Sequence, residues 1–460
     1  MRTIRIFNIY CSTRVLLFVC CEMLLVFAAF IVAACGFPRT GVPYLLMGQA
    51  YLARICWVAV LTFILSYYFD LFEHERLVGR KEIYFRLLLV LGVLSMALAA
   101  AEWLVADFAF GQNVLASGVL LLTVLLFAWF RIYEWLMSLS LFKERVYVLG
   151  DGPRAQDIVL ALKSKRFAAM EVVSGDPAVC AATAAERYAA DLRYFAQARK
   201  PLVDRVVVAM EDRRDSMPVR ELLDLRLKGA VVEDANTLIE RLSGKLLLNG
   251  LTPSSLIFFD GFNVKASFQL TRRLISILIS LTALILCLPL FPILMVAVRL
   301  SSPGPVFFSQ TRVGKHGKLI NIYKFRTMRQ DAEAEGAVWA TKNDPRVTPL
   351  GRFMRKTRLD EIPQLWNVLK GDMAFIGPRP ERPEFVEWLT RELPFYELRH
   401  SVRPGLTGWA QVRYQYGASL EETRNKLEFD LYALKHQSLG LDLLILFETV
   451  KTILLRRGAQ

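Results

Sequence analysis

Apolar residues gather in four long blocks in the first third of the chain, separated by short polar connections. Each block approaches the ~20 residues that an α-helix needs to cross a lipid bilayer. The pattern predicts a bundle of four membrane-spanning helices within residues 1–144. The blocks are Val15–Ala34, Leu52–Phe69, Leu87–Ala106 and Val114–Phe130.

Charged residues indicate how this bundle lies in the membrane. Glu22, Arg54 and Glu102 interrupt the blocks. Charges inside a membrane are often functional, but we expect these three to lie near helix ends or to face neighbouring helices. Basic residues precede the first span, fill the second connection and follow the fourth span, with Arg39 the main exception, so both ends of the bundle are predicted to be cytoplasmic. The residues concerned are Arg2, Arg5, Arg14, Arg76, Arg80, Lys81, Arg86, Arg131, Lys143 and Arg145.

Residues 145–262 alternate between short β-type runs and helical runs, a pattern that predicts a Rossmann-like α/β domain with a parallel, doubly wound sheet. The strands are expected at Arg145–Gly150, Asp204–Ala209 and Ala230–Glu233, and the helices at Ala155–Ser164, Pro218–Lys228 and Asn236–Leu242.

The turn after the first of these strands, Gly150-Asp151-Gly152-Pro153-Arg154-Ala155, fits the pattern G-x-G-x-x-[G/A]. Such a turn seats a pyrophosphate at a helix N-terminus. Here Pro153 removes one backbone N–H from the turn, and no acidic residue is convincingly placed at the end of the second strand. A regulatory or assembly domain is therefore favoured over a nucleotide-binding one.

The apolar run Leu274–Val298 carries no charge, but Pro289 and Pro292 interrupt it. Each proline removes a helical hydrogen bond and kinks the axis. Basic residues flank the run on both sides, and a crossing helix would place one group on the wrong face. The pattern predicts a hairpin, within residues 263–300, that enters and leaves by the cytoplasmic leaflet; the alternative is an ordinary fifth span.

Residues 301–460 are rich in Arg, Lys, Trp and Pro and predict a mainly α soluble domain. Its last apolar stretch, Leu439–Leu455, is typical of a helix that lies at the membrane interface. Taken together, the patterns indicate a multidomain membrane protein.

Composition and net charge limit the classes of partner that the chain is expected to bind. The 460 residues carry a net charge of +14, and 54% of them are hydrophobic. A basic chain binds nucleic acid or anionic membranes and phosphate ligands, and the membrane-type blocks favour the second class, so no nucleic-acid partner is expected. The seven cysteines show no C-x-x-C spacing, which indicates neither a disulfide framework nor a zinc site. No convincing cleavage site follows the first block. The chain is expected in the inner membrane of a bacterium, with its larger parts facing the cytoplasm.

Two adjacent carboxylates, Asp360 and Glu361, lie behind the predicted hairpin. A proline suits the first turn of a helix, so a helix over Ile362–Lys370 is predicted to begin at about this dyad. Its dipole, with Arg355 or Arg358, is expected to keep Asp360 ionised.

The two carboxylates diverge if they lie on a helix, which suits distinct roles. One would attack phosphorus, and the other would hold a divalent cation. From spacing alone, the simpler interpretation is favoured, with Asp360 as a helix cap and Glu361 as a dipole partner.

Cations cluster in short motifs around this dyad. Arginine forks match phosphate oxygens, so a diphosphate substrate and a phospholipid acceptor would explain several such clusters. The motifs are Lys324–Met328, Arg352–Arg358, Gly377–Arg382 and Arg403–Gly408.

Six motifs occur in a fixed order, and together they resemble the bacterial sugar transferase family, the monotopic phosphoglycosyl transferases. The four spans and the α/β domain resemble the larger polyisoprenyl-phosphate hexose-1-phosphate transferases. The tail Tyr414–Ser419 and Tyr432 are similar to the subgroup associated with exopolysaccharide export. The six motifs are Ser302–Phe308, Gln310–Gly314, Lys324–Met328, Leu359–Leu365, Gly377–Pro380 and Arg403–Val412.

The resemblance implies transfer of a hexose-1-phosphate from a UDP-sugar to undecaprenyl phosphate, with release of UMP, at the start of exopolysaccharide synthesis. It implies that Asp360 is the nucleophile of a covalent phosphosugar intermediate and that Glu361 holds Mg²⁺. It also implies that Pro289 breaks the re-entrant helix. The residues expected to bind substrate phosphates are Lys324, Arg326, Arg355, Arg358, Arg379, Arg382 and Arg403.

The sugar stays open, and a homodimer is compatible with the resemblance. Two departures from the family pattern are the Val412–Tyr416 segment, which leaves sugar or nucleotide contacts there open, and Ala374 in place of a serine. A conventional lipid-linked glycosyltransferase would normally show a D-x-D motif, which the sequence lacks. A non-catalytic export or scaffold component would not need the dyad.

Overall fold

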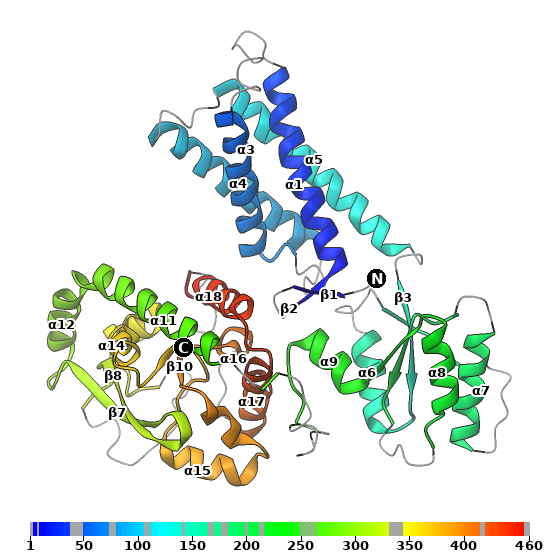
Figure 1. The fold of residues 1–460 in the computed structure, drawn as a ribbon. Helices are drawn as coiled ribbons and strands as arrows, with labels where there is room; N and C mark the ends of the chain where they lie inside the picture. Colours follow the sequence, from blue (N-terminus) through cyan, green and yellow to red (C-terminus); the bar gives the residue numbers. More distant parts are fainter. Residues whose placement is uncertain are drawn as a thin grey trace. The chain divides into compact units, whose positions relative to one another are not determined.

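The structure of the chain is a computed structural model. It describes residues 3–6, 9–36, 49–72, 80–104, 110, 112–139, 143–163, 170–175, 183–197, 201–210, 216–248, 251, 253, 256, 261–262, 265–330, 344–414 and 419–454. Contacts divide the chain into two compact units, which are described separately (Figure 1). The first is Met1–Ile4 with Tyr10–Leu238, and the second is Arg5–Ile9 with Ile239–Gln460. The finer division of the chain at residues 144, 262 and 300 stays a prediction.

The four N-terminal apolar blocks form four long helices, as predicted. Two short paired strands, β1 (Thr3–Ile6) and β2 (Ile9–Ser12), precede them. Each helix contains a stretch long and apolar enough to cross a membrane, which confirms the expected membrane protein. The helices are α1 (Thr13–Cys35), α3 (Gln49–Tyr68), α4 (Arg80–Leu104) and α5 (Gln112–Ser138).

Two of the three charges inside the bundle, Glu22 and Glu102, face neighbouring groups, as expected. Glu22 is buried, and the Ser66 hydroxyl of α3 donates a hydrogen bond of 2.5 Å to its Oε1. Glu102 lies near the end of α4 and accepts a hydrogen bond of 2.8 Å from the backbone N–H of Phe110. Of the residues that indicated orientation, Arg2, Arg39 and Arg76 lie outside the described part of the chain.

The predicted parallel sheet is present in the rest of the first unit, with strand order β4-β3-β5-β6. All its pairings are parallel. The elements are β3 (Glu144–Leu149), α6 (Pro153–Lys163), β4 (Met170–Val172), α7 (Ala184–Ala196), β5 (Arg205–Val208), α8 (Val219–Leu227), β6 (Val231–Asp234) and α9 (Ala235–Ser243).

Two of these elements, β4 and α7, were not predicted from the sequence. β4 has three residues, and one of them is the charged Glu171, so the sequence shows no β-type run there. The signal for α7 was available: Thr183 and Glu186 form a reciprocal capping box at its start, and T-x-x-E before a helical pattern marks an N-terminus.

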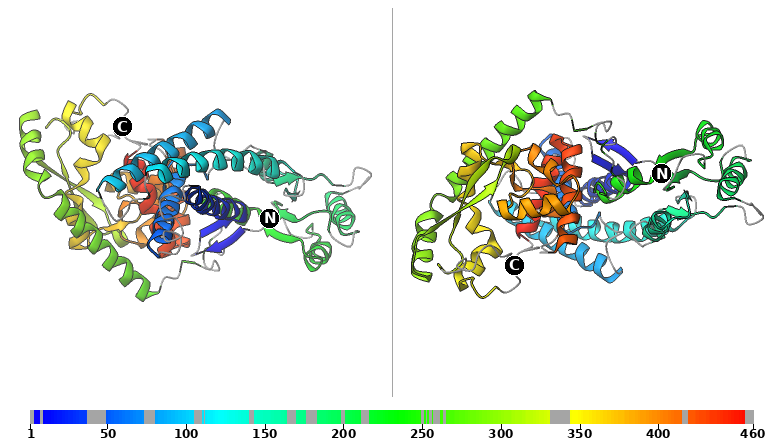
Figure 2. Two further views of the ribbon diagram at one scale, coloured as in Figure 1. Left: turned by 90° about the horizontal axis from the view of Figure 1, so that it is seen from above. Right: turned by 90° about the horizontal axis from the view of Figure 1, so that it is seen from below.

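In the second unit, the apolar run after residue 265 forms two helices, α11 (Ala266–Cys287) and α12 (Leu290–Ser301). They separate at Leu288 and Pro289, where the sequence analysis placed the break. By length and composition, α11 is a fifth candidate span. The bent pair runs along one edge of the second unit in all three views (Figures 1 and 2).

The remainder of the unit is mostly helical, as predicted. β7 (Phe307–Val313) and β8 (Leu319–Phe325) form an antiparallel hairpin around η6 (Lys315–Gly317), and β9 (Ala374–Ile376) pairs in parallel with β10 (Gly405–Thr407). Leu389, Tyr396, Trp409, Leu431 and Ile445 contribute to its largest core cluster. The other elements are α13 (Pro349–Thr357), η7 (Leu359–Glu361), α14 (Gln364–Lys370), α15 (Pro383–Glu392), η8 (Tyr396–Ser401), α16 (Trp409–Arg413), α17 (Leu420–Lys435) and α18 (Leu439–Leu454).

The C-terminal helix α18 is apolar on two faces. Leu441 and Ile445 are buried in the core, whereas Leu443 and Val450 are exposed. An exposed apolar face is what a helix at a membrane interface needs, so the predicted interfacial position of α18 stays a prediction that this pattern supports.

Candidate functional site

The carboxylate dyad lies on η7, between α13 and α14. The predicted helix start at Ile362 is wrong by two residues: α14 begins at Gln364, and the dyad forms a separate 3₁₀ turn. Arg358, just before the dyad, has φ of 59°, in the left-handed region. A non-glycine residue there costs roughly 1–2 kcal/mol. Such strain is often stored at functional sites.

Helix α13 is fixed against the loop after β8. The Thr348 hydroxyl accepts a hydrogen bond of 2.9 Å from the Gly351 N–H, and the Thr348 N–H donates one of 3.0 Å to the Thr327 carbonyl. A Cβ atom at Gly351 would lie 2.1 Å from that carbonyl oxygen, so only glycine allows this approach. One turn later, Arg355 Nε donates to Thr327 Oγ1 at 3.0 Å. The loop therefore fixes an arginine beside the dyad.

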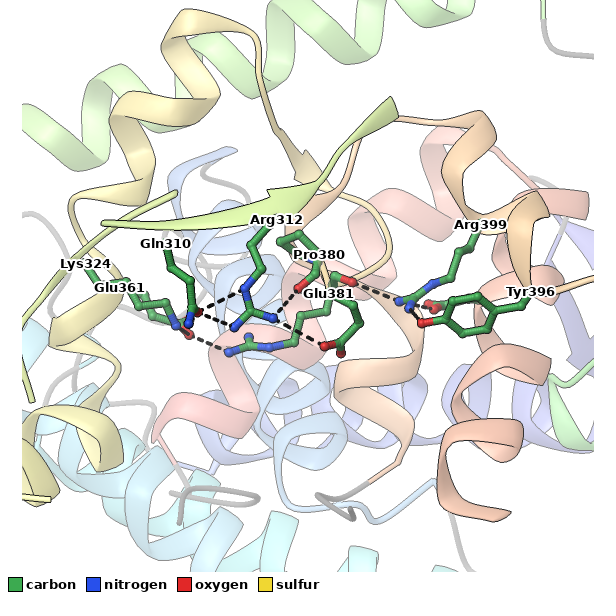
Figure 3. A network of polar contacts seen from close by, with 10 residues as sticks. Gln310, Arg312, Lys324, Glu361, Pro380, Glu381, Tyr396 and Arg399 are labelled. Carbon is green, nitrogen blue, oxygen red and sulfur yellow. Dashed lines mark hydrogen bonds and ion pairs between the residues drawn. The ribbon is translucent and has the colours of Figure 1, made fainter. Parts of the chain in front are cut away.

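Three cations converge on one oxygen of Glu361. Lys324 Nζ of β8 lies 3.1 Å from Oε1 (Figure 3). Arg379 Nη2, in the turn after β9, lies 2.9 Å from the same oxygen. Arg358 Nη1 completes the group at 3.7 Å. Burial alone would raise the pKa of Glu361. The charges of Lys324, Arg379 and Arg358 outweigh burial and hold the pKa far below its usual range.

The neighbouring Asp360 has a different environment. It is buried, and among the residues that the structure describes no group hydrogen-bonds to its Oδ1. Burial and the Glu361 carboxylate raise the pKa of Asp360, although Lys324, Arg355 and Arg358 oppose them. Burial and the second carboxylate were not considered in the expectation that a helix dipole and one arginine keep Asp360 ionised, and they oppose that effect. The ionised state of Asp360 stays a prediction. The two environments push the two pKa values apart, the pattern that separates roles in catalytic pairs.

A second layer of polar contacts, missed by the sequence analysis, holds Arg379 and its neighbours. Arg399 is buried, and it donates to the Arg379 carbonyl at 2.9 Å, to Asp430 Oδ2 at 3.0 Å and to the Tyr396 hydroxyl at 2.6 Å. Asp430 lies on α17, 31 residues further along the chain. Sequence spacing gives no signal for such a contact.

Arg312 joins the same network from β7. Its guanidinium donates to the Pro380 carbonyl at 3.2 Å and to Gln310 Oε1 at 2.7 Å, and it pairs with Glu381 at 3.3 Å (Figure 3). Gln310 and Arg312 stood out in the sequence as part of a family motif, but no role was predicted for them.

Three of the predicted phosphate ligands lie elsewhere. Arg326 donates to the carbonyls of Ser302 at 2.6 Å and Pro303 at 2.9 Å, so its guanidinium fixes the turn after α12. Arg382 is buried at the N-terminus of α15. Arg403 is exposed, just before β10. The dyad thus gathers Lys324, Arg355, Arg358 and Arg379 of the seven.

The dyad can supply part of the ligand set of a divalent cation, and the remaining ligands would have to come from substrate and water. Among the described residues, no group of three or more His, Cys, Asp or Glu side chains is placed to hold a metal ion. The cations reach Glu361 through Oε1, which leaves Oε2 as the oxygen that can face a metal. Mg²⁺ is commonly held by one or two carboxylates together with substrate phosphates and water. The dyad fits that mode.

Comparison with known proteins shows the family to which the chain belongs. The family model for bacterial sugar transferases matches residues 267–456. A UDP-glucose:undecaprenyl-phosphate glucose-1-phosphate transferase from Escherichia coli (strain K12) is 34% identical over 327 residues, which cover 69% of each chain. The chain belongs to the bacterial sugar transferase family. The predicted membership, and with it the transferase class, is confirmed.

Two other relatives have names that state a different sugar or a pathway. A UDP-N-acetylgalactosamine-undecaprenyl-phosphate N-acetylgalactosaminephosphotransferase from Aeromonas hydrophila is 52% identical over 182 residues, 39% of this chain and 43% of that protein. The exopolysaccharide production protein PSS from Rhizobium leguminosarum bv. phaseoli is 41% identical over 191 residues, 40% of this chain and 96% of that protein. The chain thus spans less than half of the Aeromonas protein.

Proposed function

We propose that this sugar transferase moves a hexose-1-phosphate from a UDP-sugar to undecaprenyl phosphate in two steps. In the first, the Asp360 carboxylate attacks the phosphorus that bears the sugar, the bond to the bridging oxygen breaks, and UMP leaves. In the second, an oxygen of undecaprenyl phosphate attacks the same phosphorus and displaces the carboxylate. The product is a lipid-linked sugar diphosphate, and Asp360 is regenerated.

The observation that carries this proposal is the contrast within the dyad. A nucleophile needs an oxygen that is not already occupied, and Asp360 Oδ1 has no hydrogen-bond partner among the described residues. Glu361 is instead held by Lys324, Arg379 and Arg358. This separation supports a nucleophilic Asp360 and a fixed, ionised Glu361.

The cations around the dyad would bind the diphosphate. Lys324, Arg358 and Arg379 bring three positive charges to one carboxylate, which is more positive charge than Glu361 neutralises. Arg355 adds a fourth beside Asp360. Fixed cations of this kind stabilise charge that moves onto the leaving phosphate. The Arg399 contact to the Arg379 backbone would keep that cation in place.

Glu361, through Oε2, together with the substrate diphosphate, would hold the expected Mg²⁺. When bound, the ion would neutralise diphosphate charge and favour departure of UMP. The residues of the chain would orient the sugar phosphate against Asp360 and keep water from the buried carboxylate.

The helix pair α11–α12 would place this chemistry at the membrane. Arg273 of α11 donates to the carbonyls of Val368 at 2.5 Å and Leu369 at 2.9 Å on α14. Leu294 and Val298 of α12 pack in one cluster with Phe325 and Met354. Since the start of α11 and the end of α12 both contact the same unit, these contacts support a hairpin that re-enters the leaflet. They argue against a fifth span, although α11 is long enough for one. We place the unit on the cytoplasmic face of the inner membrane, where UDP-sugars are made.

The leaving nucleotide tests this function. Purified protein, undecaprenyl phosphate, Mg²⁺ and a panel of UDP-sugars, including UDP-glucose and UDP-N-acetylgalactosamine, should yield UMP with the sugar that is the substrate. Release of UDP would contradict the proposal and support a conventional glycosyltransferase. Failure of every UDP-sugar in the panel would contradict the proposed donor class.

A further inference from the structure

The α/β part of the first unit contains a cavity of about 360 Å³ beside β3 and β4. Sites for small ligands commonly have volumes of ~300–1,000 Å³. In open parallel sheets, ligands bind outside the carboxyl ends of the strands. Asp151 follows β3, Ser174 and Gly175 follow β4, and all three line the cavity. The transferase reaction proposed above leaves this cavity without a role.

The turn after β3 is not itself the seat of a phosphate. Asp151 pairs with Arg187 of α7 and accepts a hydrogen bond of 2.8 Å from the Tyr188 hydroxyl. It therefore places a negative charge where a pyrophosphate would lie. The first residue of α6 is Pro153, which has no N–H to donate. A ligand would have to use the cavity beside the turn.

A carboxylate lies at the end of β4, a strand that was not predicted, and it comes from α7. Asp191 is 5% exposed, and its Oδ2 accepts a hydrogen bond of 2.6 Å from the Tyr147 hydroxyl. A Cβ atom at Gly175 would lie 2.2 Å from this carboxylate, so only glycine allows the chain after β4 to lie against it. In dinucleotide-binding folds, an acidic residue at this place binds the ribose hydroxyls.

The other lining groups supply the remaining parts of a nucleotide site. Lys163 and Arg187 provide two cations, and a guanidinium with five N–H donors can contact a phosphate while it also contacts Asp151. Val159 of α6 and Val172 of β4 provide an apolar wall against which a base can pack. Ligand sites of this kind combine an apolar lining with a few placed polar groups.

We propose that this cavity binds a nucleoside phosphate. The Asp191 carboxylate accepts hydrogen bonds from the ribose hydroxyls, Lys163 and Arg187 contact the phosphate, and Val159 and Val172 pack against the base. The site is separate from the dyad, and the proposal does not depend on the transferase reaction.

Photolabelling of the full-length protein in nanodiscs tests whether the cavity binds a nucleoside phosphate. It also shows which part of the chain carries the label. The probes are azido-AMP and thio-UMP, and the labelled peptides are mapped by mass spectrometry. We expect label within residues 144–197 from at least one probe. Arg187→Ala should reduce this label about tenfold, as expected for loss of a charge-assisted phosphate contact. Gly175→Val, which displaces Asp191, should remove it.

Arg193→Ala is the matched control. It removes the same side chain from the same helix, but Arg193 pairs with Glu221 and does not line the cavity, so its label should equal that of the unchanged protein. Thermal unfolding of each variant shows whether it is folded. Label found only within residues 302–414, no label from either probe, or label that a folded Arg187→Ala variant retains would overturn the proposal. None of these results bears on UMP release.

Discussion

The dyad in the second unit and the cavity in the first both bring carboxylates and cations together, but their charge differs. At the dyad, Lys324, Arg358 and Arg379 gather on the single carboxylate of Glu361. In the cavity, Asp151 and Asp191 face Lys163 and Arg187, two charges of each sign. An excess of fixed positive charge suits a site that receives a diphosphate and a phospholipid. A balanced set suits a ligand with both hydroxyl and phosphate groups.

The largest effect is expected at the dyad. Asp360→Asn keeps the shape of the side chain but removes the proposed nucleophile, and turnover should fall by about 10⁴-fold or more. Asp224→Asn is the matched control: Asp224 pairs with Lys228 on a helix surface and its side chain is 52% exposed, so activity should stay within about twofold, as for surface pairs. Release of nucleotide measures both. Normal turnover by the Asp360→Asn variant would refute its role.

The excess of cations is tested next. Arg379→Met removes a charge from both Glu361 and the proposed diphosphate, and kcat/KM should fall about 10²–10³-fold, as when one stabilising donor is removed. Arg391→Met is the control, since Arg391 pairs only across a helix surface with Glu387 and both side chains are more than 70% exposed. Equal effects of the two substitutions would show that the charge around Glu361 has no special role.

Most residues around the dyad could be predicted from the sequence. The contrast between local motifs and long-range contacts explains why some could not. Short local motifs contain the dyad and the cations around it, so these residues can be found from the sequence alone. The cations are Lys324, Arg355, Arg358 and Arg379. The contacts of Arg326 could not be predicted, because its carbonyl partners at Ser302 and Pro303 are brought close only by the β7–β8 hairpin. Its expected role in phosphate binding stays a prediction.

Long-range contacts account for the other gaps. The pairing of Arg399 with Asp430 joins residues 31 apart, and the Asp191 carboxylate reaches the end of β4 from a separate helix. Neither contact has a local signal. The break at Pro289 was predictable because proline acts on its own backbone.

The pH dependence of the reaction sharpens the difference between the two carboxylates. Burial and Glu361 raise the pKa of Asp360, and in the proposed reaction only its ionised form attacks. Below this raised pKa, kcat/KM should therefore fall about tenfold for each pH unit, and above it kcat/KM should level off. Glu361 stays ionised throughout, because its pKa is lowered.

Lys324→Met should move this acid limb to higher pH in whatever activity remains, because Lys324 lowers the pKa of Asp360. Initial rates across the pH range locate the acid limb of the unchanged protein and that of the variant. A limb that stays at the position of an ordinary aspartate, or that does not move in the variant, would contradict the assignment.

A smaller effect is expected on stability. Gly351→Ala places a Cβ atom 2.1 Å from the Thr327 carbonyl oxygen and should reduce the free energy of unfolding by roughly 1–3 kcal/mol, as overpacking does. Gly92→Ala is the control, since nothing lies within 4 Å of a Cβ atom there. Unfolding in denaturant measures both. Equal stabilities would show that α13 does not depend on this close contact.

The smallest effect is expected in the first unit. Arg187→Ala should change basal turnover, measured without added nucleotide, by no more than about twofold, as for a substitution remote from the chemistry. Loss of turnover in a folded Arg187→Ala variant would show that the cavity takes part in the reaction. The two regions would then not have separate roles.

The central claim is that Asp360 becomes covalently linked to a sugar phosphate. The most direct measurement is to mix the protein with a UDP-sugar radiolabelled at the sugar-bearing phosphorus, without undecaprenyl phosphate, and to quench with acid. We predict label on the peptide that contains Asp360, its disappearance when undecaprenyl phosphate is added before the quench, and no label in the Asp360→Asn variant. Full turnover by a protein that never carries this label would contradict the account.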